Sequence, residues 1–245
     1  MEEESRTALT DSIVVNDITE EEVARLEGDG AVPVSPQEIE RMQGEEKNKW
    51  IDSMKEELAS LNRREVYDEV TNQDLHRRYW SKGIRTKQVP GRLLTIKKPL
   101  HDGEGGWKHK ARAVVCGNCE PGSIANDIHN RAEVPTTFEL RTLLALGSLG
   151  EQVTAWNHGE PASQRQPWSL GALDVKTAFL YAELNEEEDG IVVAQPPAIL
   201  VRLGLIPPGT PWLLNKALYG LRCAPKRWSE KERFHTQEPQ VHSEW

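Results

Sequence analysis

The sequence lacks the features that mark membrane, secreted or disulfide-stabilised proteins. No apolar run approaches the roughly 20 residues that a helix needs to cross a bilayer. The chain starts Met1-Glu2-Glu3-Glu4, which is acidic where a secretory signal needs a basic region followed by an apolar one. Its 3 cysteines cannot all pair within the chain, which fits a reducing compartment. We therefore expect a soluble, intracellular protein with no membrane partner, either cytoplasmic or nuclear.

Apolar residues are also scarce for a globular protein. Hydrophobic residues make up 37% of the sequence and charged residues 28%. This composition predicts that part of the chain stays unburied. The 245 residues allow one large domain or two small ones, and they contain no internal repeat. The composition alone does not indicate an oligomeric state.

The net charge of -9 is unevenly distributed along the chain. Residues 1–30 hold ten Asp and Glu and two Arg, which gives -8, so the other 215 residues sum to -1. Residues 77–112 hold eleven Lys and Arg against Asp102 and Glu104, which gives +9. Such a stretch suits a polyanion such as nucleic acid or a nucleotide phosphate. A solvated hairpin face with no ligand fits the same charge pattern equally well.

Two regions follow from local patterns. Residues 1–34 are acidic and aperiodic, which predicts a disordered tail. Ser35-Pro36-Gln37-Glu38 is a capping box with proline at the first helical position, and it predicts a helix running to about Asn62. The apolar face of this helix would be Trp50, Met54, Leu58 and Leu61.

Two strand-like runs flank a turn in the basic region. Residues 92–98 and 108–116 enclose the glycine-rich stretch 101–106, which predicts a β-hairpin. Alternation along the second strand places Lys108, Lys110 and Arg112 on one face. Three cations on one face of one strand form a better phosphate-binding arrangement than scattered charges.

Further along, the pattern predicts a short strand at 66–70 and a helix at 138–149. The leucines of that helix (Leu140, Leu143, Leu144 and Leu146) are expected to face inward. Residues 151–168 predict a loop, residues 183–189 an acidic turn, and residues 191–194 a short buried strand.

Several segments in fixed order resemble the motifs of one known family. The strand Lys110-Ala111-Arg112-Ala113-Val114-Val115-Cys116-Gly117 is similar to "KARLVAKG" of the Ty1/copia-type retrotransposon reverse transcriptases, the RNA-directed DNA polymerases of that class. The stretch Leu173-Asp174-Val175-Lys176-Thr177-Ala178-Phe179-Leu180 closely matches "MDVKTAFL". Residues 216–228 contain a stretch similar to "LYGLKQSPRQW", preceded by Lys216 and Ala217. Cys223 stands where the family usually has Gln. The resemblance covers about residues 45–230.

The resemblance implies an α+β fold that is part of a right-hand polymerase. It would comprise a fingers β-hairpin and an incomplete palm sheet with packed helices. The expected division is a tail at 1–34, a partial reverse transcriptase domain at 35–230, and an unmatched, disordered C-terminus at 231–245. The implied partners are an RNA or DNA template–primer and a deoxynucleoside triphosphate (dNTP), and the implied cofactor is Mg²⁺, used in pairs for nucleotidyl transfer.

The resemblance also assigns roles to individual residues. Asp174 would be the catalytic, metal-binding carboxylate, although the residues alone favour a helix N-cap there. Phe179 would be a steric gate against the ribose 2′-hydroxyl, or else a core residue. The nucleotide-binding residues would be Lys110, Arg112, Val175, Phe179, Tyr219 and Gly220. The nucleic-acid-binding residues would be Lys108, Lys216, Arg222, Pro225, Lys226 and Arg227.

One part of the family pattern is missing from these 245 residues. The family carries an adjacent Asp-Asp pair downstream of "LYGL", and this sequence contains no Asp-Asp dipeptide. One carboxylate cannot hold two Mg²⁺ ions, because Mg²⁺ demands near-octahedral coordination. We therefore expect a polymerase fragment that is inactive alone. The alternatives are a salt-sensitive nucleic-acid-binding module and a decayed transposon reading frame with no selected function.

Overall fold

The computed structural model describes residues 30–100, 105–119, 136–148 and 175–237 of the chain. These residues divide between two compact units. The larger unit contains residues up to 131 and from 179 onward, and the smaller one spans 132–178.

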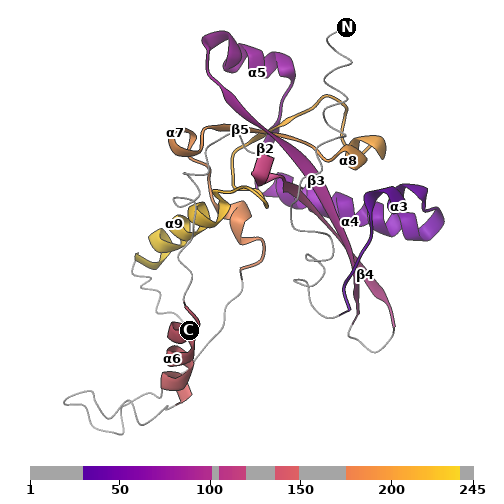
Figure 1. Ribbon diagram of the computed structural model, residues 1–245. Helices are drawn as coiled ribbons and strands as arrows, with labels where there is room; N and C mark the ends of the chain where they lie inside the picture. The colour runs from indigo at the N-terminus through magenta and orange to yellow at the C-terminus, as the bar shows by residue number, and fades with distance from the viewer. Residues whose placement is uncertain (1–29, 101–104, 120–135, 149–174, 238–245) are drawn as a thin grey trace, which may run out of the picture. The chain divides into compact units, whose positions relative to one another are not determined.

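The larger unit is built on a mixed sheet of short strands around one long strand (Figure 1). Among the described residues the strand order is β1-β3-β5-β6-β2, and β4 pairs with β3 as well. The strands are β1 (Val32–Pro33), β2 (Tyr67–Glu69), β3 (Thr86–Pro99), β4 (Trp107–Val115), β5 (Ile191–Gln195) and β6 (Trp212–Leu214). The predicted strands at 66–70 and 191–194 are confirmed by β2 and β5.

The predicted hairpin is also confirmed. Strands β3 and β4 pair in antiparallel register from Gly91 with Val115 to Pro99 with Trp107. The expected turn residues His101 to Glu104 lie outside the described residues. The first strand is longer than its pattern suggested, because residues 86–90 pair in parallel with β5 before β3 turns to β4. At this change of partner, a Cβ on Gly91 would lie 2.2 Å from the carbonyl oxygen of Gln195, so only glycine fits.

The single helix expected from Pro36 to about Asn62 is two helices in the structure. Helix α3 (Pro36–Arg41) begins with the predicted capping box between Ser35 and Glu38. Helix α4 (Gly44–Arg63) follows after a break at Met42 and Gln43. The expectation of continuity was wrong because Gly44 takes a positive φ of 66°, which turns the chain between two helical runs.

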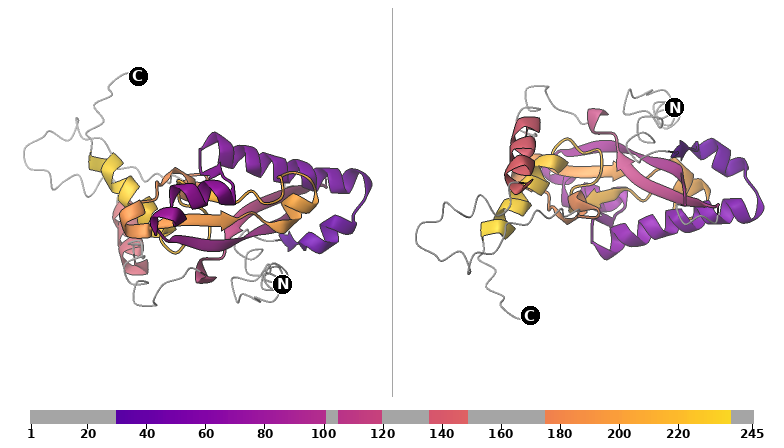
Figure 2. Two further views of the ribbon diagram at one scale, coloured as in Figure 1. Left: turned by 90° about the horizontal axis from the view of Figure 1, so that it is seen from above. Right: turned by 90° about the horizontal axis from the view of Figure 1, so that it is seen from below.

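Helix α4 anchors the core of this unit. Trp50, Met54 and Leu61 are fully buried, and Leu58 packs against the same cluster, as their helical spacing predicted. Both views in Figure 2 show this helix running alongside the β3–β4 ribbon. Burying Trp50, Met54 and Leu61 removes large apolar surfaces from water, at about 1.5–3 kcal/mol for a side chain the size of Met54.

The same helix protects an exposed strand edge. Strand β4 has β3 on one side, and on the other the Ala111 amide donates to Ser53 Oγ at 2.9 Å. The Ala113 amide donates to Glu57 Oε1 at 3.1 Å, and Ser53 Oγ donates to the carbonyl of His109 at 3.2 Å. Side chains of α4 thus satisfy backbone groups that an open edge would present to other chains.

The remaining described helices of this unit range from 4 to 14 residues in length. They are α5 (Asn72–Arg78), α7 (Glu186–Asp189), α8 (Ala198–Arg202) and α9 (Ala224–Gln237), with 3₁₀ turns at Trp80–Lys82 and Gly117–Cys119. The acidic turn expected at 183–189 is largely the single-turn helix α7, which is capped by Asn185. Helix α9 continues to Gln237, past the boundary expected at residue 230.

In the smaller unit, helix α6 (Thr137–Ser148) confirms the predicted helix at 138–149. Its leucines do not face inward as expected: Leu140, Leu143, Leu144 and Leu146 are each at least half exposed. The helical period was correctly read, but a period alone does not say what covers an apolar face. A 3₁₀ turn at Ala178–Tyr181 begins at the last residue of this unit.

None of the described helices is long and apolar enough to span a membrane.

Candidate nucleotide-binding site

Strand β4 presents its cations on the face away from the core. Ala111, Ala113 and Val115 are buried, while Lys108 is exposed and Lys110 and Arg112 are half-buried. The alternation predicted from the sequence is therefore confirmed. It arises because successive side chains of a strand point to opposite faces and the small residues pack under α4.

The end of β4 is held by the segment that carries Tyr219 and Gly220. The Val115 amide donates to the carbonyl of Tyr219 at 2.8 Å. Gly220 has a φ of 92°, and a Cβ there would lie 2.0 Å from the carbonyl oxygen of Val115. A Cβ on Gly117 would likewise lie 2.0 Å from the carbonyl oxygen of Gly220. Two glycines thus allow two backbones to approach more closely than any other residue would permit.

This close approach brings three of the predicted nucleotide-binding residues together. The guanidinium of Arg112 lies over the ring of Tyr219, 5.6 Å from its centroid. The Phe179 and Tyr219 ring centroids are 6.1 Å apart in an edge-to-face arrangement. Such cation–π and aromatic contacts contribute about 0.5–1.5 kcal/mol each and fix the orientation of the groups. Phe179 is also partly buried against the core, so both roles considered for it remain compatible with its position.

Helix α4 adds a carboxylate beneath these cations. Burial raises the pKa of Glu57, and this effect exceeds the opposing ones of the Ala113 amide hydrogen bond and of the charges on Arg112 and Lys110. Nearby, hydrogen bonds from His109 and Lys97 lower the pKa of Glu46 to about 2. The sequence reading missed both glutamates. The available signal was that Glu46, Trp50, Ser53 and Glu57 follow one another at helical spacing, so polar side chains share the face of a buried tryptophan.

The predicted metal-binding residue, Asp174, lies outside the described residues. Its neighbour Val175 belongs to the smaller unit and is 38% exposed. Within the described ranges, no three His, Cys, Asp or Glu side chains group in a way that could hold a metal ion. The described residues therefore do not fit the carboxylate set that a pair of Mg²⁺ ions requires.

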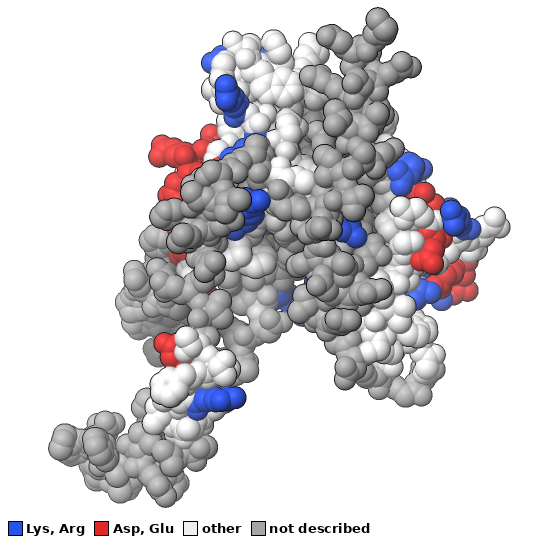
Figure 3. Space-filling view, in the orientation of Figure 1, with Lys and Arg blue, Asp and Glu red and all other residues white. Residues whose placement is uncertain are grey.

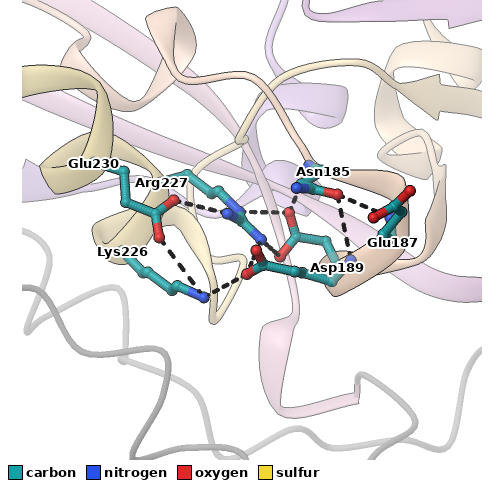
Figure 4. Close-up of polar contacts among 7 residues, drawn as sticks. Asn185, Glu187, Asp189, Lys226, Arg227 and Glu230 are labelled. Carbon is teal, nitrogen blue, oxygen red and sulfur yellow. Dashed lines mark hydrogen bonds and ion pairs between the residues drawn. The ribbon is translucent and has the colours of Figure 1, made fainter. Parts of the chain in front are cut away.

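Arg227, expected to contact nucleic acid, is instead surrounded by carboxylates. Its Nε donates to Asp189 Oδ2 at 2.7 Å and its Nη2 to Asp189 Oδ1 at 3.0 Å, a bidentate pair that Figure 4 shows. Further contacts go from Nη2 to Glu188 at 2.9 Å and from Nη1 to Glu230 at 2.7 Å. Burial lowers the pKa of Arg227, but these hydrogen bonds and charges outweigh it and raise the pKa above its usual value.

The other predicted nucleic-acid contacts are spread over the unit. Lys226 Nζ lies 2.6 Å from Glu188 Oε2, next to the Arg227 network. Lys216 Nζ donates to the carbonyl of Arg64 at 2.5 Å, near the C-terminal end of α4. Arg222 and Pro225 are half-buried, and Pro225 lies in the first turn of α9. The described side chains thus place Lys226 and Arg227 in an acidic environment, where neighbouring carboxylates compete with phosphate.

Comparison with known proteins shows the class to which this chain belongs. A family model described as "Reverse transcriptase (RNA-dependent DNA polymerase)" matches residues 161–238. The chain belongs, within that class, to the Ty1/copia type. It is 31% identical over 193 residues to the tobacco (Nicotiana tabacum) protein "Retrovirus-related Pol polyprotein from transposon TNT 1-94". That similarity covers 76% of this chain but only 11% of the relative. No solved structure matches the chain.

Proposed function

We propose that this chain provides the nucleotide-binding and template-binding surface of a copia-type reverse transcriptase. In this proposal the β3–β4 hairpin is the fingers element of a right-hand polymerase, and the strands from β5 onward belong to its palm. The observation that carries the proposal is the contact of Arg112 with Tyr219 and of Tyr219 with Phe179. These residues come from three distant parts of the sequence, and each was assigned to nucleotide binding by resemblance.

The chemistry of the three side chains suits an incoming dNTP. A guanidinium makes charge-assisted, bidentate hydrogen bonds to phosphate oxygens. The ring of Tyr219 orients Arg112 and offers a flat surface below a base or sugar. Phe179 stands beside Tyr219, where a bulky ring would exclude a 2′-hydroxyl. Lys110 lies two residues from Arg112 on the same strand face and adds a second cation for the triphosphate.

The test is equilibrium dialysis of radiolabelled dATP against the whole chain with template–primer present. Arg112→Ala should weaken dATP binding by roughly 10-fold or more, because it removes hydrogen bonds to a charged group. Arg63→Ala is the matched control, since Arg63 is exposed at the end of α4. Phe179→Ala should narrow the preference for dATP over ATP. Equal dATP affinities for wild type, Arg112→Ala and Arg63→Ala would overturn the proposal.

Catalysis requires residues beyond those proposed to bind the nucleotide. Nucleotidyl transfer in this family requires several carboxylates around two metal ions, and these 245 residues contain no Asp-Asp pair. We propose that the chain binds without completing the reaction by itself.

A nucleic-acid-binding module without nucleotide selectivity is the second candidate. The observation that favours it is the shared face of Lys108, Lys110 and Arg112 on β4. Binding would then fall steeply with salt, because each phosphate contact releases counterions. Salt-insensitive binding, or no change on replacing the three cations together by alanine, would rule it out. A decayed reading frame with no selected function predicts neither dATP nor nucleic-acid binding.

A further inference from the structure

A second surface feature lies at the start of β3, where the chain leaves α5. A hollow of about 470 Å³ is lined by Trp80, Gly83, Ile84, Arg85, Thr86 and Gln88. Two of the lining residues have exposed apolar side chains: Trp80 is 37% exposed and Ile84 is 43% exposed. Two others, Thr86 and Gln88, offer polar atoms. The hollow thus combines an aromatic surface, an aliphatic one and hydrogen-bonding groups.

The ring of Trp80 is held in place although it is exposed. Its indole N–H donates to Thr86 Oγ1 at 3.0 Å, and the Gln88 amide donates to the same oxygen at 3.2 Å. The His76 ring approaches Trp80 edge-on, with centroids 6.5 Å apart. A single exposed hydrophobic residue is ordinary on a protein surface. Here the indole N–H is fixed by a hydrogen bond, and part of the ring is open to solvent. Such a ring can stack against a flat group without first changing its orientation.

The segment that forms this hollow is basic, although Asp74, just before it, pairs with Arg77 at 2.7 Å. Residues 75–88 contain Arg77, Arg78, Lys82, Arg85 and Lys87, which makes five cations, and no Asp or Glu. Lys82 and Arg85 are exposed and make no ion pair within the described part of the chain. On the face drawn in Figure 3, basic side chains lie over the α5 end of the molecule, above a group of acidic ones. The hollow is therefore aromatic and cationic together.

This surface is separate from the Arg112–Tyr219 contact. Trp80 is bonded to Thr86, at the beginning of β3, whereas Arg112 is paired with Leu94 of the same strand. Eight residues of extended strand at roughly 3.3 Å each give a distance of about 26 Å. Figure 1 shows α5 near one end of β3 and β4 toward the other. One ligand nucleotide could not touch both places.

We propose that the hollow at Trp80 binds single-stranded nucleic acid, independently of the nucleotide site. A base stacks on the exposed face of Trp80, while Arg85 and Lys82 contact the flanking phosphates. The Thr86 hydroxyl and the second N–H of the Gln88 side-chain amide can still donate, and they add hydrogen bonds that do not depend on base identity. Aromatic stacking tolerates every base, and cations beside it follow the backbone, which is the usual combination in sequence-independent single-strand binding. Duplex DNA is not the ligand, since its bases are already stacked on one another.

Fluorescence anisotropy with a labelled 20-nucleotide oligo(dT) and the whole chain tests this proposal. Trp80→Ala should weaken binding by roughly 5- to 150-fold, the range for loss of one stacked base. Trp80→Phe should restore most of the affinity, because phenylalanine keeps a stacking face. The recovery should be incomplete, because phenylalanine cannot donate a hydrogen bond to Thr86. Arg85→Ala should reduce the salt slope by about 0.7, the value for one single-strand phosphate contact, and the control Arg63→Ala should not.

Further measurements locate the contact. An oligonucleotide carrying 5-iodouracil should photocrosslink to the peptide that contains Trp80. Trp80→Ala should leave binding of a 20-base-pair duplex and of dATP unchanged, and a thermal melt should show that the variant is folded. The proposal fails if folded Trp80→Ala binds oligo(dT) as wild type does, if Trp80→Phe is as weak as Trp80→Ala, or if duplex binding falls equally. Loss of dATP binding in Arg112→Ala with oligo(dT) binding intact would support two separate sites.

Discussion

At the scale of single residues, the site depends on glycines that permit backbone contact. Gly220 combines a φ of 92° with a Cβ position 2.0 Å from the Val115 carbonyl oxygen. Gly204 offers a matched comparison, since its φ is 70° but nothing lies within 4 Å of its Cβ position. Both positions require the left-handed backbone region. Only position 220 also requires that the residue have no side chain, because a Cβ there would collide with the Val115 carbonyl.

Gly220→Ala should therefore be much more harmful than Gly204→Ala. The left-handed backbone alone costs an alanine about 1–2 kcal/mol, which is the expected loss for Gly204→Ala. At Gly220 the collision with Val115 adds to this, so we expect a loss above ~2 kcal/mol, together with weakened dATP binding as Tyr219 moves from Arg112. Urea unfolding of both variants measures the difference. Equal losses would show that the segment can relax away from β4.

Glu57 gives a prediction about pH. Its folded pKa is raised by burial above the unfolded value, so the folded chain holds the proton more tightly. The free energy of unfolding therefore falls as pH rises from the unfolded pKa of Glu57 through its raised folded pKa. The cost of burying the ionised carboxylate persists at neutral pH. Glu57→Gln keeps an oxygen to accept the Ala113 amide but carries no charge. It should raise the melting temperature at pH 7 and match wild type at pH 4, where Glu57 is protonated.

The control for this prediction is Glu56→Gln, which removes one charge from the exposed face of the same helix. If the gain at pH 7 is the same in both variants, it reflects overall charge rather than burial of Glu57. A loss of stability in Glu57→Gln would mean that Arg112 and Lys110 depend on the Glu57 charge.

At the scale of elements, the network around Arg227 joins α7 to α9. Asp189 is the last residue of α7, and Arg227 is the fourth residue of α9. Both side chains are almost fully buried, with 5% and 6% exposed. Removing one partner of a buried pair leaves the other charge without compensation. We therefore propose that Arg227 holds these helices together and does not bind phosphate.

Arg227→Ala should destabilise the chain by about 3–5 kcal/mol, the usual cost of breaking a buried ion pair. Arg202→Ala is the matched control. Arg202 Nε donates to Glu40 at 2.5 Å, but its side chain is 53% exposed, so its loss should cost only about 0–1 kcal/mol. Chemical denaturation of both variants gives the two values. A small loss for Arg227→Ala, accompanied by weaker oligo(dT) binding, would restore its role in nucleic-acid contact.

The elements also show which features a sequence can predict. The capping box at Ser35 and the β3–β4 hairpin involve residues close together in the chain, and their patterns predicted them correctly. The break before Gly44 escaped prediction, because a glycine in a helical pattern can be tolerated or can turn the chain. The partner change of β3 at Gly91 and the cover that α4 gives to β4 depend on contacts between distant residues, which periodicity does not encode.

At the scale of the whole molecule, the candidate site likewise depends on contacts between residues that are distant in the sequence. Arg112 and Tyr219 are 107 positions apart, and only resemblance to a family suggested that they serve one site. Their contact in the structure agrees with that suggestion without testing it. The carboxylates of the α7–α9 network, by contrast, could not be anticipated from the cations of the matching motif. Charge in a sequence shows where a cation is, but its burial and neighbours decide which anion it meets.

The whole chain is not expected to catalyse DNA synthesis by itself. Primer extension on an RNA template with Mg²⁺ should yield no product above the protein-free reaction, because two-metal transfer needs more carboxylates than Asp174 supplies. The same preparation should still bind the template–primer, with salt dependence, which separates lack of chemistry from lack of folding. A known reverse transcriptase on the same template is the positive control. Extension by this chain that disappears in Asp174→Asn would contradict the prediction, since it would require these 245 residues to assemble the metal site themselves.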